Sequence, residues 1–263
     1  MAFSLAEVQR AAAALESGEF QTGPPGQRRA QATHETWDPA EAVIVIAGAA
    51  ARVGTTVAAT AIAEAAATEV RMVEAGPMHT TGLAEATTAE LGVRATGWRQ
   101  GQRDLVLIER TTSSHERPEN VPPPAPTERG LTVVDISWDL TRVVASGSWL
   151  AVALASHPLV LTTTATAPGM RALEAAIDVC GRDDVHAMVL GPDRKKWPKT
   201  VTVAATGAVE QLAQRGRLHT IPFDRHLAVT GLDRAPLPPA VRRAAKSALT
   251  SVTRPPEGNA HVR

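Results

Sequence analysis

Short runs of β-branched and apolar residues alternate along the chain with longer segments rich in alanine and leucine. Seven runs have the length and composition of buried strands, at 42–47, 70–74, 104–109, 131–136, 158–163, 185–190 and 217–223. Five segments carry apolar residues at helical spacing, at 55–68, 141–155, 168–180, 206–215 and 238–250. Apolar strands alternating with helices are typical of a parallel sheet covered on both faces. The pattern predicts an α/β protein with a three-layer, doubly wound and mostly parallel sheet.

Segments rich in proline and glycine interrupt this pattern. Residues 1–38 start with an amphipathic stretch and continue without periodicity, which predicts an N-terminal helix and a flexible linker. The Pro-rich segment 117–130 predicts an exposed loop, and residues 253–263 predict a disordered tail. The α/β domain is therefore expected over 39–252.

Composition excludes several classes of protein. Lys and Arg number 27, as do Asp and Glu, and this balance argues against a dominant nucleic-acid-binding role. Cys180 is the single cysteine, so an internal disulfide framework is excluded, and we expect it to pack as an apolar residue ending a helix before Gly181. Because no run of about 18 apolar residues and no signal peptide occur, we expect a cytoplasmic protein without a membrane span.

The turn "GAAARVGTT" at 48–56 follows the first strand and opens a helix. Ligands of open α/β sheets bind outside the carboxyl ends of the strands, and small residues there let backbone N–H groups cradle phosphate oxygens. The candidate phosphate-binding residues are Gly48, Ala51, Arg52, Val53, Gly54, Thr55 and Thr56. The usual P-loop pattern is not matched, because Thr55 stands where the lysine belongs. A tight turn with a threonine N-cap is the alternative interpretation.

Two acids follow other predicted strands. Glu74 ends the second strand, and Asp135 ends the fourth after four apolar or β-branched residues. A buried strand that delivers a carboxylate in this way is typical of a magnesium site beside a phosphate, with Thr56 as a second metal ligand. Each acid taken alone could equally be a loop cap or a rim charge. In chain order with the glycine turn, they indicate a nucleotide site.

The order of "AVIVIAGAAARVGTT", "VRMVEAGP", "LTVVDIS", "PLVLTTTATAPGMRALEAAI" and "IPFDRHLAVTGLDRAPLP" resembles the ParA/MinD-type partition ATPases, deviant-Walker P-loop proteins. The resemblance covers about 42–250 and rests on layout more than on identity. It implies a P-loop NTPase-like fold, ATP or ADP with Mg²⁺ as cofactor, and a homodimer or a protein partner. The segment "FD…LAVTGLD" is similar to the family's segment near the adenine base.

The chain departs from the family's motifs at several positions. In the loop, Ala51 and Arg52 replace two glycines, Thr55 replaces the P-loop lysine, and Ala50 stands in place of the signature lysine. Removing such an electrostatic group typically costs about 10²–10³-fold in rate. Gly76 stands where the family has its second aspartate after strand two. Ser137 and Asp139 stand in place of the switch proline and the switch glycine. We therefore expect weak or no ATP hydrolysis and a partition, positioning, assembly or regulatory role.

Two other functions remain open from the sequence. A Rossmann-type dinucleotide-binding protein would use Glu74, which lies 20 residues after Gly54, on a ribose. A ligand-free scaffold would keep the fold and lose the site. The basic loop 194–199 around Trp197 leaves nucleic acid open as a partner, and 97–104 is a candidate partner-facing loop. A solvated loop with one packed indole is the alternative for each.

Overall fold

The computed structural model describes residues 36–77 and 82–254. The predicted N-terminal helix, most of the linker that follows it and nearly all of the predicted tail lie outside these ranges.

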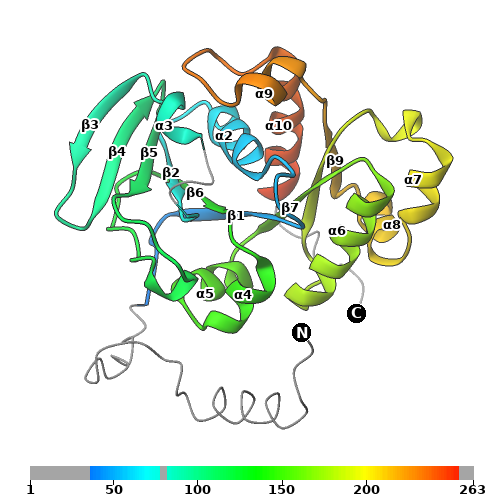
Figure 1. Cartoon of the computed structure of the whole chain (residues 1–263), viewed down its shortest axis with the longest axis horizontal. Helices are drawn as coiled ribbons and strands as arrows, with labels where there is room; N and C mark the ends of the chain where they lie inside the picture. The colour runs from blue at the N-terminus through cyan, green and yellow to red at the C-terminus, as the bar shows by residue number, and fades with distance from the viewer. Residues whose placement is uncertain (1–35, 78–81, 255–263) are drawn as a thin grey trace, which may run out of the picture. The chain divides into compact units, whose positions relative to one another are not determined.

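A mostly parallel sheet of nine strands forms the centre, in the order β3-β4-β5-β2-β6-β1-β7-β8-β9 (Figure 1). The strands are β1 Ala42–Gly48, β2 Val70–Glu74, β3 Ala89–Val93, β4 Trp98–Arg103, β5 Val106–Thr111, β6 Leu131–Ile136, β7 Leu159–Thr164, β8 His186–Leu190 and β9 Leu218–Ile221. Only β4 pairs antiparallel with its neighbours β3 and β5. The predicted fold class is confirmed.

Helices cover both faces of this sheet (Figure 1). One apolar cluster joins the sheet to α2 Thr55–Ala65, α3 Leu83–Ala86, α9 Arg225–Thr230 and α10 Pro239–Val252. The other joins the opposite face to α4 Leu140–Ser146, α5 Trp149–Ser156, α6 Ala167–Cys180, α7 Lys199–Ala204 and α8 Gly207–Gln214. Short 3₁₀ helices occur at Pro118–Asn120 (η1) and Arg194–Lys196 (η2). The three layers follow from strands that are apolar on both faces.

Two glycines end helices, one at a predicted helix end and one inside a predicted helix. The single helix predicted over 141–155 is two helices, because Gly147 adopts φ 61° and ends α4 before α5 begins at Trp149. Cys180 is the last residue of α6 and Gly181 follows it with φ 62°. Glycine reaches this left-handed conformation without steric cost and is common after a helix C-terminus. The prediction for Cys180 is confirmed, and the uninterrupted helix was wrong.

The segment 97–104 is not a partner-facing loop. It contains the whole of β4, and the Trp98 side chain is fully buried. The Pro-rich segment 117–130, expected to be exposed, packs on the protein instead: Trp149 Nε1 donates to the Val121 carbonyl at 2.8 Å, and Arg71 donates to the Ala125 carbonyl. Val121 itself is buried. This segment therefore covers part of the sheet face that a helix would otherwise cover.

Candidate functional site

The turn after β1 reverses the chain through two left-handed residues. Gly54 is the N-cap of α2 with φ 83°, and Arg52 has φ 60° although it carries a side chain. The Ala49 N–H donates to the Thr162 carbonyl at 2.9 Å, which ties the turn to the end of β7. The predicted phosphate loop is thus a compact turn that leads directly into the N-terminus of an 11-residue helix.

The Thr55 side chain points back toward the sheet. Its hydroxyl is hydrogen-bonded to that of Thr162 at 2.9 Å. A Cβ on Gly48 would lie 2.7 Å from Thr55 Oγ1 and 2.8 Å from the Ala50 carbonyl oxygen, closer than real contacts allow. Gly48 therefore has to be glycine, and the Thr55 hydroxyl at the start of α2 is engaged with β7.

Asp135 lies at the centre of the sheet, opposite Ile46 of β1 and Glu74 of β2 in the strand register. It is fully buried, and its Oδ1 accepts a hydrogen bond from the Ser137 hydroxyl at 2.9 Å. Its Oδ2 has no hydrogen-bond partner among the described residues. Burial raises the pKa of the Asp135 carboxyl to about 6, against the lowering effect of the Thr56 and Ser137 hydroxyls.

Glu74 is the neighbour of Asp135 and is nearly as buried, with 4% of its surface exposed. Burial, with a smaller contribution from the Asp135 charge, raises the pKa of its carboxyl to about 8 against the lowering effect of Arg110. Its Oε1 has no hydrogen-bond partner in the part of the chain that the structure describes. Glu74 and Asp135 are therefore neighbours across two strands, and the Thr56 hydroxyl lies beside Asp135.

A cleft of about 1000 Å³ opens over the turn. It is walled by residues 48–52 and 54–57, by 136–141 after β6, by one face of α6, and by Leu227, Gly231 and Leu232. The last three lie in the segment that resembles the family's adenine-binding region. Asp135 and Glu74 are not on its surface, and Val53, predicted to bind phosphate, is buried beneath it. The cleft is therefore lined mainly by small and apolar side chains.

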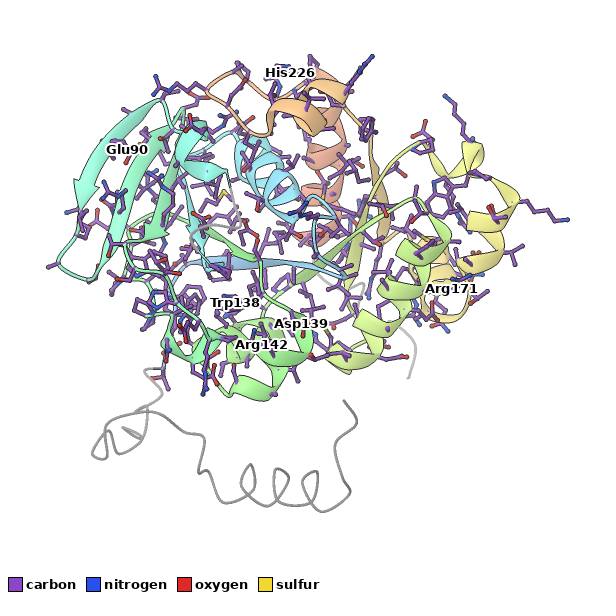
Figure 2. All side chains as sticks on the ribbon, in the orientation of Figure 1. Glu90, Trp138, Asp139, Arg142, Arg171 and His226 are labelled. Carbon is purple, nitrogen blue, oxygen red and sulfur yellow. The ribbon has the colours of Figure 1, made fainter. Side chains whose placement is uncertain are left out.

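Residues after β6 form a wall of the cleft, and the sequence indicates only two of them, Ser137 and Asp139, at positions compared with the family's switch residues. The Trp138 indole donates to the Ala75 carbonyl, and Asp139 caps α4 by accepting from the Arg142 N–H at 3.1 Å. The Arg142 guanidinium carbon lies 6.0 Å from the Trp138 ring centroid. Figure 2 shows these three side chains close together at the start of α4. Asp139 directly before the apolar run of α4 is an N-cap signal that could have located this wall.

The basic loop 194–199 does not line the cleft. Arg194 forms an ion pair with Glu210, and the Trp197 side chain is only 8% exposed, with Nε1 donating to the Pro192 carbonyl at 2.9 Å. Lys195, Lys196 and Lys199 are exposed. The indole is therefore packed and not available to stack on a base.

Among the described residues, no helix has the length and apolar character needed to cross a membrane.

The strand order argues against the Rossmann alternative. In that fold the second strand of the chain lies directly beside the first. Here β6 lies between β1 and β2, so Glu74 is adjacent to Asp135 and one strand removed from the turn. A buried Glu74 that does not reach the cleft surface is also poorly placed to bind a ribose.

The fold is similar to solved structures of the ParA family. A ParA family ATPase from Chlorobium tepidum TLS aligns with a TM-score of 0.54 and 13% identity, over 80% of this chain and 99% of that one. A plasmid partition protein from Borrelia burgdorferi B31, bound to AMPPNP, aligns with a TM-score of 0.51 and 10% identity, over 81% and 97%. No family model and no curated protein matches the sequence. The chain therefore has the P-loop NTPase-like fold of ParA-type ATPases.

Proposed function

We propose that this chain binds ATP or ADP weakly together with Mg²⁺, hydrolyses ATP little or not at all, and acts as a partition, positioning, assembly or regulatory factor. The observation that carries the proposal is the unpartnered, fully buried Asp135 oxygen behind Thr56, where the turn after β1 enters a large cleft. A buried carboxylate oxygen without a hydrogen bond is costly unless a proton or a cation completes its contacts, and Mg²⁺ is the cation that would accompany a nucleotide. The similarity to a partition protein bound to AMPPNP supports a nucleotide as ligand.

Thr56 and Asp135 fit a magnesium ion by their chemistry. Both offer oxygen atoms, the ligand type that Mg²⁺ prefers, and both lie where the turn opens α2 and β6 ends. A bound Mg²⁺ would neutralise phosphate charge. Glu74 lies next to Asp135 on the neighbouring strand, and a Mg²⁺ ion beside them would offset the repulsion between the two carboxylates.

The same site lacks the groups that make hydrolysis efficient. Thr55 cannot supply the charge of a lysine, and its hydroxyl is bound to Thr162. Loss of one such electrostatic group costs about 10²–10³-fold in rate. Ala50 also carries no charge to place across a dimer interface. We therefore expect binding without appreciable turnover, and no dimerisation through a signature lysine.

The direct test is a thermal-shift panel with ATP, ADP, GTP and NAD, each with and without Mg²⁺, combined with an ATP hydrolysis assay. A ligand that binds only the folded state raises the melting temperature. ATP or ADP with Mg²⁺ should raise it, and phosphate release should stay near background. Equal melting temperatures under every condition would indicate a ligand-free scaffold, stabilisation by NAD alone would indicate dinucleotide binding, and turnover at the level of partition ATPases would contradict the degenerate site.

Restoring the lysine tests the missing charge directly. Thr55→Lys should strengthen the ATP-dependent rise in melting temperature, because the ammonium group reaches the phosphates from the first residue of α2. The matched control is Thr250→Lys, which adds the same charge on the exposed face of α10, away from the cleft. An equal gain from both variants would show a general effect of charge and would count against the proposed phosphate site.

A further inference from the structure

Arg52 places a positive charge on the surface of the cleft. Of the described residues that line the cleft, it is the one with a basic side chain. Its side chain is exposed and takes part in no ion pair within the described ranges 36–77 and 82–254. The one acidic residue on the described cleft surface, Asp139, is engaged as the N-cap of α4. A positive charge is therefore available at the phosphate end of the cleft.

Among the described residues of the cleft, the groups next to Arg52 supply no further positive charge. Thr55 is hydrogen-bonded to Thr162, and Asp135 and Glu74 are buried and do not line the cleft. The remaining anion-binding groups are uncharged: the backbone N–H groups of the turn and the N-terminus of α2. A di- or triphosphate bound there carries several negative charges, which these dipoles compensate only in part.

We propose that the Arg52 guanidinium is the phosphate ligand that takes the place of the missing lysine. This inference rests on the proposed nucleotide site and names the residue that sets its ligand class, a nucleoside di- or triphosphate. A guanidinium presents a planar fork of N–H donors that matches two phosphate oxygens at once. The Arg52 side chain extends from the turn before α2, whereas a P-loop lysine would extend from the first residue of the helix. Arg52 therefore holds the phosphates without reproducing the geometry of that lysine.

The left-handed backbone at Arg52 makes a clean test possible. At φ 60° a glycine is favoured over any residue with a Cβ, so Arg52→Gly should leave the ligand-free melting temperature unchanged or raise it. Arg52→Ala removes the guanidinium and keeps the backbone strain. Arg52→Lys keeps a charge and removes the fork. Arg243→Ala, on the exposed face of α10, is the control for net charge.

The experiment is calorimetric titration of the full chain and these variants with ADP and Mg²⁺, alongside ligand-free melting curves. Arg52→Gly and Arg52→Ala should bind roughly ten- to a hundredfold more weakly, the effect of losing hydrogen bonds to a charged group. Arg52→Lys should fall between, Arg243→Ala should match the natural chain, and adding Thr55→Lys to Arg52→Gly should recover binding. Unchanged affinity in Arg52→Gly and Arg52→Ala would overturn this inference alone, whereas a natural chain that binds neither ADP nor ATP would overturn the proposed function and this inference with it.

Discussion

Gly76 lies where the chain segments after β2 and β6 approach each other closely. A Cβ on Gly76 would lie 2.7 Å from the Cβ of Ser137, so the ends of β2 and β6 approach too closely for a side chain. The sequence identifies Gly76 as the position where the family has its second aspartate. The contact that excludes this aspartate comes from Ser137, 61 residues away in the chain, and could not be predicted from sequence.

Because of this contact, we expect the effects of substituting Gly76 and Ser137 on stability to be non-additive. Gly76→Ala should lower the free energy of unfolding by about 1–3 kcal/mol, because the added methyl group overpacks the contact. Ser137→Gly removes the opposing Cβ, so the double variant should be more stable than the sum of the two single effects predicts. Denaturant unfolding of all four proteins measures this coupling.

Gly130→Ala is the matched control for this pair, since a Cβ there meets no atom within 4 Å. It should unfold at nearly the same denaturant concentration as the natural chain. Strictly additive effects of Gly76→Ala and Ser137→Gly would contradict the contact.

The candidate site could be predicted from sequence only in its local parts. The turn 48–56, Asp135 and Glu74 follow from strand ends and small residues, because these signals lie within a few positions of one another. The hydrogen bond between Thr55 and Thr162 joins residues 107 positions apart. Such long-range contacts depend on the strand order, and no local pattern specifies them.

At the scale of elements, the prediction failed at two strands: β3, whose residues are all exposed, and β4, whose polar residues are largely buried. All seven predicted strands occur, but β3 and β4 were missed, since β4 reads "WRQGQR" and lacks apolar alternation. Two of its polar positions gain internal partners: Gln100 donates to Glu109 at 2.7 Å, and Arg103 donates to Glu64 at 2.6 Å and to the Ala86 carbonyl at 2.8 Å. Paired polar groups can be buried. A hydrophobic pattern does not detect a strand of this kind.

Trp98 provides the test of β4 as a structural element. Its side chain is fully buried, and Nε1 donates to the Pro123 carbonyl at 3.4 Å. Trp98→Ala should lower the free energy of unfolding by about 3–5 kcal/mol, through lost burial and the cavity that remains. Trp98→Phe, which keeps most of the apolar surface, should cost less. Chemical denaturation measures both, and a loss below about 1 kcal/mol for Trp98→Ala would favour an exposed, partner-facing indole instead.

At the scale of the whole molecule, the sheet order places charge in the interior. Since β2 and β5 follow β6 outward from the centre, Asp135, Glu74 and Arg110 stand in one row across three adjacent strands. Burial dominates the pKa shifts of both acids in this row. The stability of the entire fold is therefore linked to the protonation of groups beside the proposed site.

The raised pKa of Glu74 predicts how the free energy of unfolding changes with pH. Its pKa is about 8 in the folded protein and near 4.5 in the unfolded chain, so the folded state keeps a proton that the unfolded state releases. Stability should fall as pH rises from about 5 to about 8, by up to about 1.4 kcal/mol per pH unit. Glu74→Gln carries no titrating group, so its unfolding free energy should decline less over this range and exceed that of the natural chain at pH 8.

Urea unfolding at several pH values measures the difference between the two proteins, which cancels contributions common to both. One such contribution comes from His186, because burial lowers its pKa to about 4. Its effect on stability has the opposite sign to that of Glu74, so stability rises with pH between about pH 4 and 6.5. Glu119→Gln makes the same chemical change at an exposed residue and should follow the natural chain. Parallel pH profiles for Glu74→Gln and the natural chain would show that Glu74 is ionised in the folded protein, as it would be if Arg110 compensated its charge fully.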